Sequence, residues 1–215
     1  MSVQSASTSL EHALRSEVGF CFIVYLASNK YDSPYAWWFV DQPSIHGELQ
    51  PATLPLFRGL WLSPLTLQTF QTVTVIVEKY TTPRDAIYVF PHMPVFYLLT
   101  GRWPSGRSIV DWFDFLPDEK AKAEAGWLLL HPPAVIIDLE MPEFTWTTHE
   151  RLFRHGQPMG QRAIRSAIQQ LTSRPEAYVL ETSIPVPQYS TLGKNNAVSE
   201  NCVLKIWRVR TARPL

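Results

Sequence analysis

Asp85-Ala-Ile-Tyr-Val-Phe-Pro-His-Met-Pro-Val-Phe-Tyr-Leu-Leu-Thr-Gly-Arg-Trp103 is the stretch of this sequence from which a fold can be argued most directly. Residues 86–90 are apolar, and all of them after Ala86 are β-branched or aromatic, which predicts a buried strand. A tight turn follows, and Pro94 opens a short helix because proline at the first helical position loses no hydrogen bond. Gly101 closes the helix, so we expect it at positive φ. A strand that leads into a helix leaves backbone N–H groups at the carboxyl edge of a sheet, where ligands of α/β folds usually bind.

A second run, residues 134–139, is nearly uniformly apolar, which is typical of a strand covered on both faces. We therefore expect 86–90 and 134–139 to be neighbouring or next-neighbouring parallel strands. The side chains predicted to be almost inaccessible to solvent are Ile87, Val89, Val135 and Ile137.

The rest of the C-terminal two thirds alternates helices with strands. Ser63 and Pro64 open a helix that extends to about Tyr80. Further helices are expected over 117–130, from Thr147 or Thr148 to Arg154, and over 161–171, followed by strands at 178–182 and 203–209. This order predicts one α/β domain over 1–215, a three-layer sandwich with a mostly parallel central sheet and an antiparallel strand pair at its C-terminal edge.

The N-terminal third gives a weaker pattern. Residues 1–9 are expected to be loose, 10–17 to form two helical turns, and 20–26 to form a buried core strand. The apolar run that contains this strand has ten residues, which is too short to cross a membrane. The region 29–62 is a long loop rich in proline and aromatic residues, including Trp37 and Trp38. Its aromatic side chains either cover the core or form a platform for a ligand.

Composition excludes some functions. Nineteen basic and nineteen acidic residues cancel, which argues against nucleic acid as a partner because phosphate binding needs a basic surface. Hydrophobic residues make up 46% of the chain, as in a folded protein. The two cysteines, Cys21 and Cys202, are expected to be buried, and a bridge between them stays open. Since metal-ligand spacings are absent from the sequence, we expect neither a metal nor another cofactor.

The candidate catalytic residues follow the two predicted parallel strands. His92 comes after the first strand, Glu140 and Glu143 come after the second, and Asp111 and Asp114 lie on the connection between them. Two carboxylates beside an imidazole can share a proton and serve as acid and base. Each residue also has a structural alternative, as a turn residue, a helix-start acid or a solvated charge. Familiar nucleophile, phosphate-loop and metal-protease motifs are absent from the sequence.

The candidate ligand-binding residues are His92, Tyr97, Arg102, Trp37 and Trp38. Four arginines recur at helical intervals later in the chain and either bind a phosphate or an acidic lipid head group or form an ordinary solvated helix face; they are Arg151, Arg154, Arg162 and Arg165.

The opening stretch, with its Asp85-Ala-Ile-Tyr-Val-Phe-Pro-His-Met-Pro and Phe-Tyr-Leu-Leu-Thr-Gly-Arg102 phrases, resembles the soluble C-terminal portion of GT-C type membrane glycosyltransferases, which use polyprenol-phosphate sugars. The resemblance extends over roughly residues 30–210. The other phrases that carry it are Tyr35-Ala-Trp-Trp38, Pro133-Ala-Val-Ile-Ile137, Tyr178-Val-Leu180 and Leu204-Lys-Ile-Trp207.

The resemblance implies a non-catalytic accessory domain that assists access of a sugar or acceptor. Its partner would be a membrane-embedded glycosyltransferase portion or a sugar ligand. It also implies a position on the extracytoplasmic face of a membrane; without it, a cytoplasmic location is expected. The family's catalytic acids lie in its membrane part, so none is carried over to this chain. Two alternatives remain: a small stand-alone hydrolase or transferase that uses His92 and nearby carboxylates, and a protein-interaction module that uses the aromatic loop.

Overall fold

A computed structural model describes residues 19–21, 23–25, 27–28, 48–186 and 202–210. Its central feature is a mixed five-stranded sheet in the order β4-β3-β5-β7-β6. The strands of this sheet are β3 (Ala86–Phe90), β4 (Trp103–Pro104), β5 (Val135–Glu140), β6 (Tyr178–Val186) and β7 (Cys202–Val209). A separate pair of short antiparallel strands, β1 (Gln50–Pro51) and β2 (Trp61–Leu62), precedes it.

The two apolar runs pair as the sequence predicts. β3 and β5 are adjacent and parallel, with Ile87 opposite Val135 and Val89 opposite Ile137. All four of these side chains are at most 1% exposed. β4 extends the parallel part on one side, whereas β7 runs antiparallel to β5 and β6 antiparallel to β7. The sheet is therefore mixed, and the expected antiparallel pair at the C-terminal edge is confirmed.

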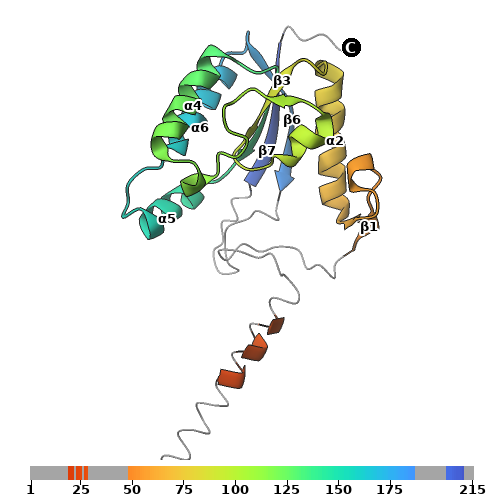
Figure 1. Ribbon diagram of the computed structural model, residues 1–215, viewed down its shortest axis with the longest axis vertical. Coiled ribbons are helices and arrows are strands. Elements are labelled where there is room, and N and C mark those ends of the chain that lie inside the picture. The colour runs from red at the N-terminus through yellow and green to blue at the C-terminus, as the bar shows by residue number, and fades with distance from the viewer. Residues whose placement is uncertain (1–18, 22, 26, 29–47, 187–201, 211–215) are drawn as a thin grey trace, which may run out of the picture.

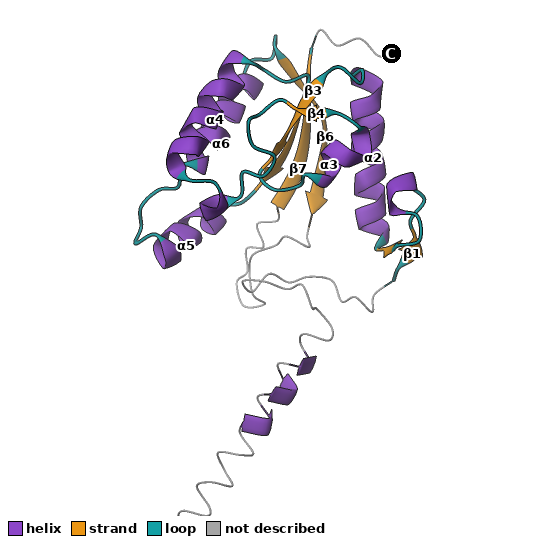
Figure 2. Ribbon diagram, in the orientation of Figure 1, coloured by secondary structure: helices purple, strands orange, loops and turns teal. Residues whose placement is uncertain are grey.

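Helices lie on both faces of this sheet (Figures 1 and 2), with α2 and α3 on one side and α4 and α6 on the other. The helical elements are α2 (Pro64–Tyr80), α3 (Val95–Thr100), α4 (Asp118–Leu130), α5 (Glu143–Phe153), α6 (Gln161–Thr172) and the 3₁₀ turns η1 (Pro55–Phe57) and η2 (Phe113–Phe115). The buried core lies between these layers and includes Val73, Val77, Leu128, Ile164 and Ile168.

Local signals in the sequence account for most helix ends. The Ser63 hydroxyl accepts the backbone N–H of Thr66 at 3.2 Å and caps α2. Gly101 ends α3 in the left-handed conformation, at φ 60°, which confirms its predicted role. The start predicted for α5 is wrong, because the helix begins at Glu143 and not at Thr147 or Thr148. Pro142 precedes this start, and the acid in the first turn is favoured by the helix dipole.

The strand predicted over 20–26 is also wrong. The described residues among 19–28 are helical, and they expose the large apolar side chains of Phe20, Ile23, Val24 and Tyr25. Cys21 is exposed as well, contrary to expectation, while Cys202 is buried in β7 as expected. Among the helices that the structure describes, none has the length and apolar character needed to cross a membrane.

Some sequence expectations fall outside the described residues. They concern the loose start (1–9), the two helical turns at 10–17, and the aromatic part of the loop (29–47), which contains Trp37 and Trp38.

Candidate functional site

His92 lies directly after β3, in the turn that leads to α3. The peptide bond before Pro91 is cis. The imidazole packs edge-on against Trp112, with 4.2 Å between the ring centroids. Burial lowers the pKa of His92 from 6.5 to about 4, because the imidazolium form would lose hydration there. His92 is therefore neutral near pH 7 and belongs to the packed interior of the turn.

Asp111 is brought to the same turn but serves to close it. Its backbone N–H donates to the Pro91 carbonyl oxygen at 2.7 Å, and its carboxylate accepts the Tyr88 hydroxyl at 2.7 Å. The residue is 1% exposed, and burial raises its pKa. Tyr88 and Asp111 thus tie β3 to the connection that follows β4.

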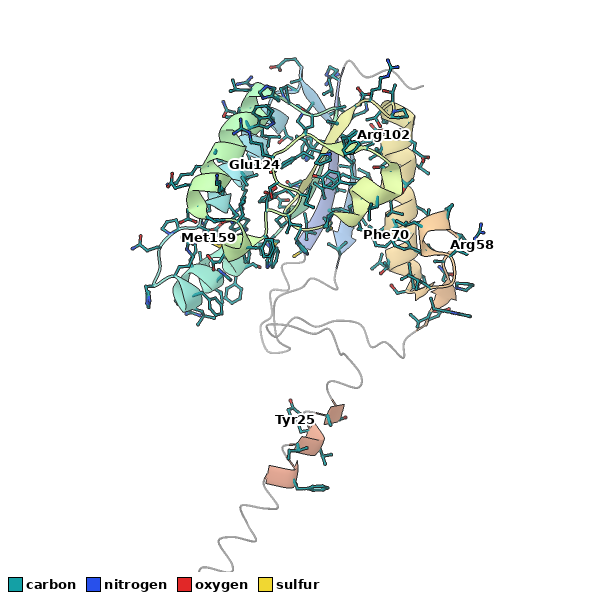
Figure 3. The ribbon with its side chains drawn as sticks, in the orientation of Figure 1. Tyr25, Arg58, Phe70, Arg102, Glu124 and Met159 are labelled. Carbon is teal, nitrogen blue, oxygen red and sulfur yellow. The ribbon has the colours of Figure 1, made fainter. Side chains whose placement is uncertain are left out.

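Tyr97 and Arg102, predicted as ligand-binding residues, also have structural partners. The Tyr97 hydroxyl accepts the backbone N–H of Val89 at 3.0 Å. The Arg102 guanidinium donates to the hydroxyl and carbonyl oxygens of Thr81, both at 2.9 Å, and to the Thr100 carbonyl oxygen at 2.6 Å. Arg102 therefore joins the ends of α2 and α3, and Figure 3 shows it beside the end of α2.

Glu124 is a buried acid that the sequence reasoning missed. It is 2% exposed, and both of its carboxylate oxygens accept the backbone N–H of Arg107 at 3.0 Å. Burial raises its pKa. Nearby, the Trp127 indole N–H donates to the Ser105 carbonyl oxygen at 2.8 Å. α4 thereby holds the loop after β4, and the only sequence signal was an acid on the buried stripe of a helix.

Asp114 pairs with a histidine, but the histidine is His149 and not His92. The Asp114 carboxylate lies 2.6 Å from Nε2 of His149 and accepts a guanidinium N–H of Arg154 at 2.7 Å. Partial burial opposes ionisation, but these two partners hold the pKa of Asp114 below its usual value. The Arg154 guanidinium also contacts Asp118, whose carboxylate accepts the backbone N–H of Gly160 at 2.8 Å. The pair lies at the surface, within a network that joins η2, α4 and α5.

The remaining acids and arginines form ion pairs between α5 and α6. Glu143 contacts Arg162 and Arg165, both at 2.7 Å, and Glu150 accepts Arg162 at 2.6 and 2.8 Å. The hydrogen bonds from Arg162 hold the pKa values of Glu143 and Glu150 below their usual range. Arg151 is exposed. Three of the four periodic arginines therefore neutralise carboxylates of this chain.

A different arrangement occurs at the carboxyl end of β5. Here a cavity of about 60 Å³ lies between the sheet and helices α5 and α6. Asp138, which neither candidate list included, lines it together with Glu140, Arg165 and Lys205. Loss of hydration raises the pKa of Asp138 from 3.8 to about 7, with a further contribution from the Glu140 charge. The available sequence signal was a single acid in the otherwise apolar run 134–139. We call this space the β5 cavity.

The aromatic wall of the β5 cavity contains a second unusual group. Trp146 of α5 is 1% exposed, and its indole N–H lacks a hydrogen-bond partner among the described residues. Its ring is stacked with Phe90, and the guanidinium groups of Arg162 and Arg165 lie 5.6 and 5.3 Å from its ring centroid. The β5 cavity thus combines aromatic walls with a donor and an acceptor.

The opposite edge of the sheet carries a wider, open cavity of about 660 Å³. It lies where β3 and β5 begin and β7 ends, and its lining includes Tyr80, Asp85, His131 and Val209. The sequence reasoning considered only the carboxyl edge. Within the described ranges, no three His, Cys, Asp or Glu side chains are grouped so that they could hold a metal ion.

Comparisons with known proteins found no match to the chain among family models, curated proteins or solved structures.

Proposed function

We propose that this chain is a non-catalytic accessory domain that works beside a membrane-embedded glycosyltransferase of the GT-C type and assists access of a sugar or acceptor. The observation that carries the proposal is that the candidate residues after β3 have structural partners within the fold. His92, Asp111, Tyr97 and Arg102 are packed or hydrogen-bonded within the fold, so this stretch serves architecture. A domain that shapes a site for another polypeptide needs such rigidity and no acid–base pair of its own.

The helical residues within 19–28 support the membrane part of this proposal. Phe20, Ile23 and Tyr25 are each more than 60% exposed, on a segment that is apolar in sequence on every side. A helix that is hydrophobic all round is typical of a protein core or a membrane environment. We propose that this segment contacts lipid or the membrane-embedded partner, on the extracytoplasmic face that the resemblance implies.

Co-flotation with phosphatidylcholine vesicles tests this association. We expect the full chain to float with the vesicles, because burying these apolar side chains in lipid is favourable by about 25 cal/mol per Å². A Phe20→Ser/Ile23→Ser variant should stay in the dense fraction. A matched control is Leu130→Ser, which changes an exposed leucine at the end of α4 and should float like the unaltered chain. Absence of flotation, or equal loss in the control, would contradict the proposal.

The enzyme alternative now depends on a different pair of residues. Within the part of the chain that the structure describes, His149 and Asp114 form a contact that resembles an acid–base dyad, because a carboxylate that holds one ring nitrogen orients the other. An assay against p-nitrophenyl esters, phosphates and glycosides separates the two functions. The accessory role predicts no turnover; turnover that is lost in His149→Ala but kept in the exposed control His131→Ala would favour the enzyme.

A further inference from the structure

The β5 cavity holds two polar groups whose bonding capacity is unused. Among the described residues, the buried indole N–H of Trp146 has no hydrogen-bond partner, and the partly exposed Asp138 accepts no hydrogen bond at its carboxyl group. A buried group such as this N–H is nearly always paired, since leaving it unpaired costs about 1–3 kcal/mol. Both residues line the same small space. Such a pair of groups suits a guest that binds to both.

The charges around the cavity limit the kind of guest. Asp138 and Glu140 supply two carboxyl groups, and Arg165 and Lys205 supply two cations. Lys205 already contacts Glu140, and Arg165 contacts Glu143. An anionic guest would face the carboxylates of Asp138 and Glu140, and a cationic guest would face Lys205 and Arg165, whose charges already act on Asp138. Either charge would meet a like charge in a confined space, which is costly. The guest should therefore be uncharged.

Hydrogen-bonding chemistry narrows the choice further. An ionised carboxylate only accepts, and an indole N–H only donates, so the guest must donate to Asp138 and accept from Trp146. A hydroxyl group does both. The rings of Phe90, Trp146 and Trp207 line the rest of the space and suit the C–H groups that carry hydroxyls. A volume of about 60 Å³ admits a group of a few heavy atoms, since one water needs roughly 10–15 Å³.

We propose that the β5 cavity binds a small uncharged group bearing hydroxyls, such as glycerol or the hydroxymethyl end of a sugar. This inference deepens the proposed function, on which it rests for the origin of the sugar, because it names where the domain would contact one. The site uses residues of β3, β5, β7, α5 and α6, and it includes neither His92 nor the apolar helical segment. Its failure can therefore be told apart from failure of the flotation test.

A titration followed by NMR tests the site with glycerol and methyl α-glucoside as probes. In ¹⁵N-labelled protein the indole N–H signal of Trp146, assigned by its absence from Trp146→Phe, should shift and saturate as glycerol is added at pH 8. Asp138→Leu should weaken the apparent affinity about tenfold or more, because the acceptor is lost. Glu119→Gln, which alters an exposed carboxylate on α4, should leave the affinity unchanged.

Three outcomes would overturn the proposal. A shift that rises linearly without saturation would show only a solvent effect. Saturable binding that is equally strong in Asp138→Leu would place the site elsewhere. A Trp146 indole signal that is unmoved by either probe, together with cross-peaks to water, would show that the cavity holds water alone.

Discussion

The carboxyl ends of β3 and β5 are neighbours in one sheet, yet the polar residues at the two ends have different surroundings. After β3, His92 packs on Trp112 and Asp111 is bound by Tyr88, so the turn is closed. At the end of β5, Asp138 lacks such a bond and faces a cavity. Position at a strand end is shared by both. What distinguishes the end of β5 is the cavity beside its polar groups, because a buried atom without a hydrogen-bond partner among the described residues also occurs after β3, at Oδ1 of Asp111.

The two ends also differ in the sign of their response to pH. Desolvation lowers the pKa of His92 to about 4 and raises that of Asp138 to about 7, so both groups are mainly neutral in the folded chain between these two pH values. Between pH 4 and pH 6.5, His92 is mainly protonated and Asp138 mainly ionised in the unfolded chain, whereas both are mainly neutral in the folded chain. Stability from the histidine therefore falls as the pH drops, whereas stability from the aspartate falls as the pH rises. The two groups therefore make the free energy of unfolding change with pH in opposite directions, and a variant at each residue should reveal its contribution.

The largest effect is expected for Asp138→Asn. The folded pKa lies above the unfolded value of 3.8, so ionisation destabilises the native state progressively from about pH 4 and fully above pH 7. Removing the charge should raise the free energy of unfolding at pH 8 by on the order of 2–4 kcal/mol, and change it little at pH 4. Urea denaturation at both pH values measures this. An equal change at both would show that the cavity walls and the Glu140 charge do not keep Asp138 neutral against the opposing charges of Lys205 and Arg165.

His92→Gln should have the next largest effect, with the opposite pH dependence. The folded pKa lies below 6.5, so wild-type stability from this group is complete above pH 6.5 and is lost as the pH falls to about 4. The variant should lose packing against Trp112 at every pH. The loss of unfolding free energy that wild type shows between pH 6.5 and pH 4, on the order of 2–3 kcal/mol, should be absent from the variant. Urea denaturation of the variant and wild type across pH 4–7 tests this. Parallel profiles would contradict the burial of a neutral imidazole.

Local signals in the sequence predicted the β3 end well and the β5 cavity not at all. The pairing of 86–90 with 134–139 and the stop at Gly101 depend on residues close in sequence or on uniform apolarity. The Asp138 site depends on how α5 and α6 dock on the sheet, which no local pattern encodes. The strand predicted over 20–26 is wrong, because a short apolar segment has no periodicity that separates a strand from a helix.

The smallest expected effect tests the closed side of the comparison, at the residue that ends α3. Gly101 has φ 60° and no atom within 4 Å of an added Cβ, so Gly101→Ala isolates backbone conformation from crowding. Because a Cβ is disfavoured in the left-handed region, the free energy of unfolding should fall by about 1 kcal/mol. Gly126→Ala is the matched control. That glycine is also unobstructed but lies inside α4 without a positive φ, so alanine should stabilise the helix by roughly 0.5–1 kcal/mol. Urea denaturation of both variants should therefore give changes of opposite sign. Changes of the same sign would mean that the conformation of Gly101 does not end α3, and that the Arg102 contacts with Thr81 and Thr100 set the end of the helix instead.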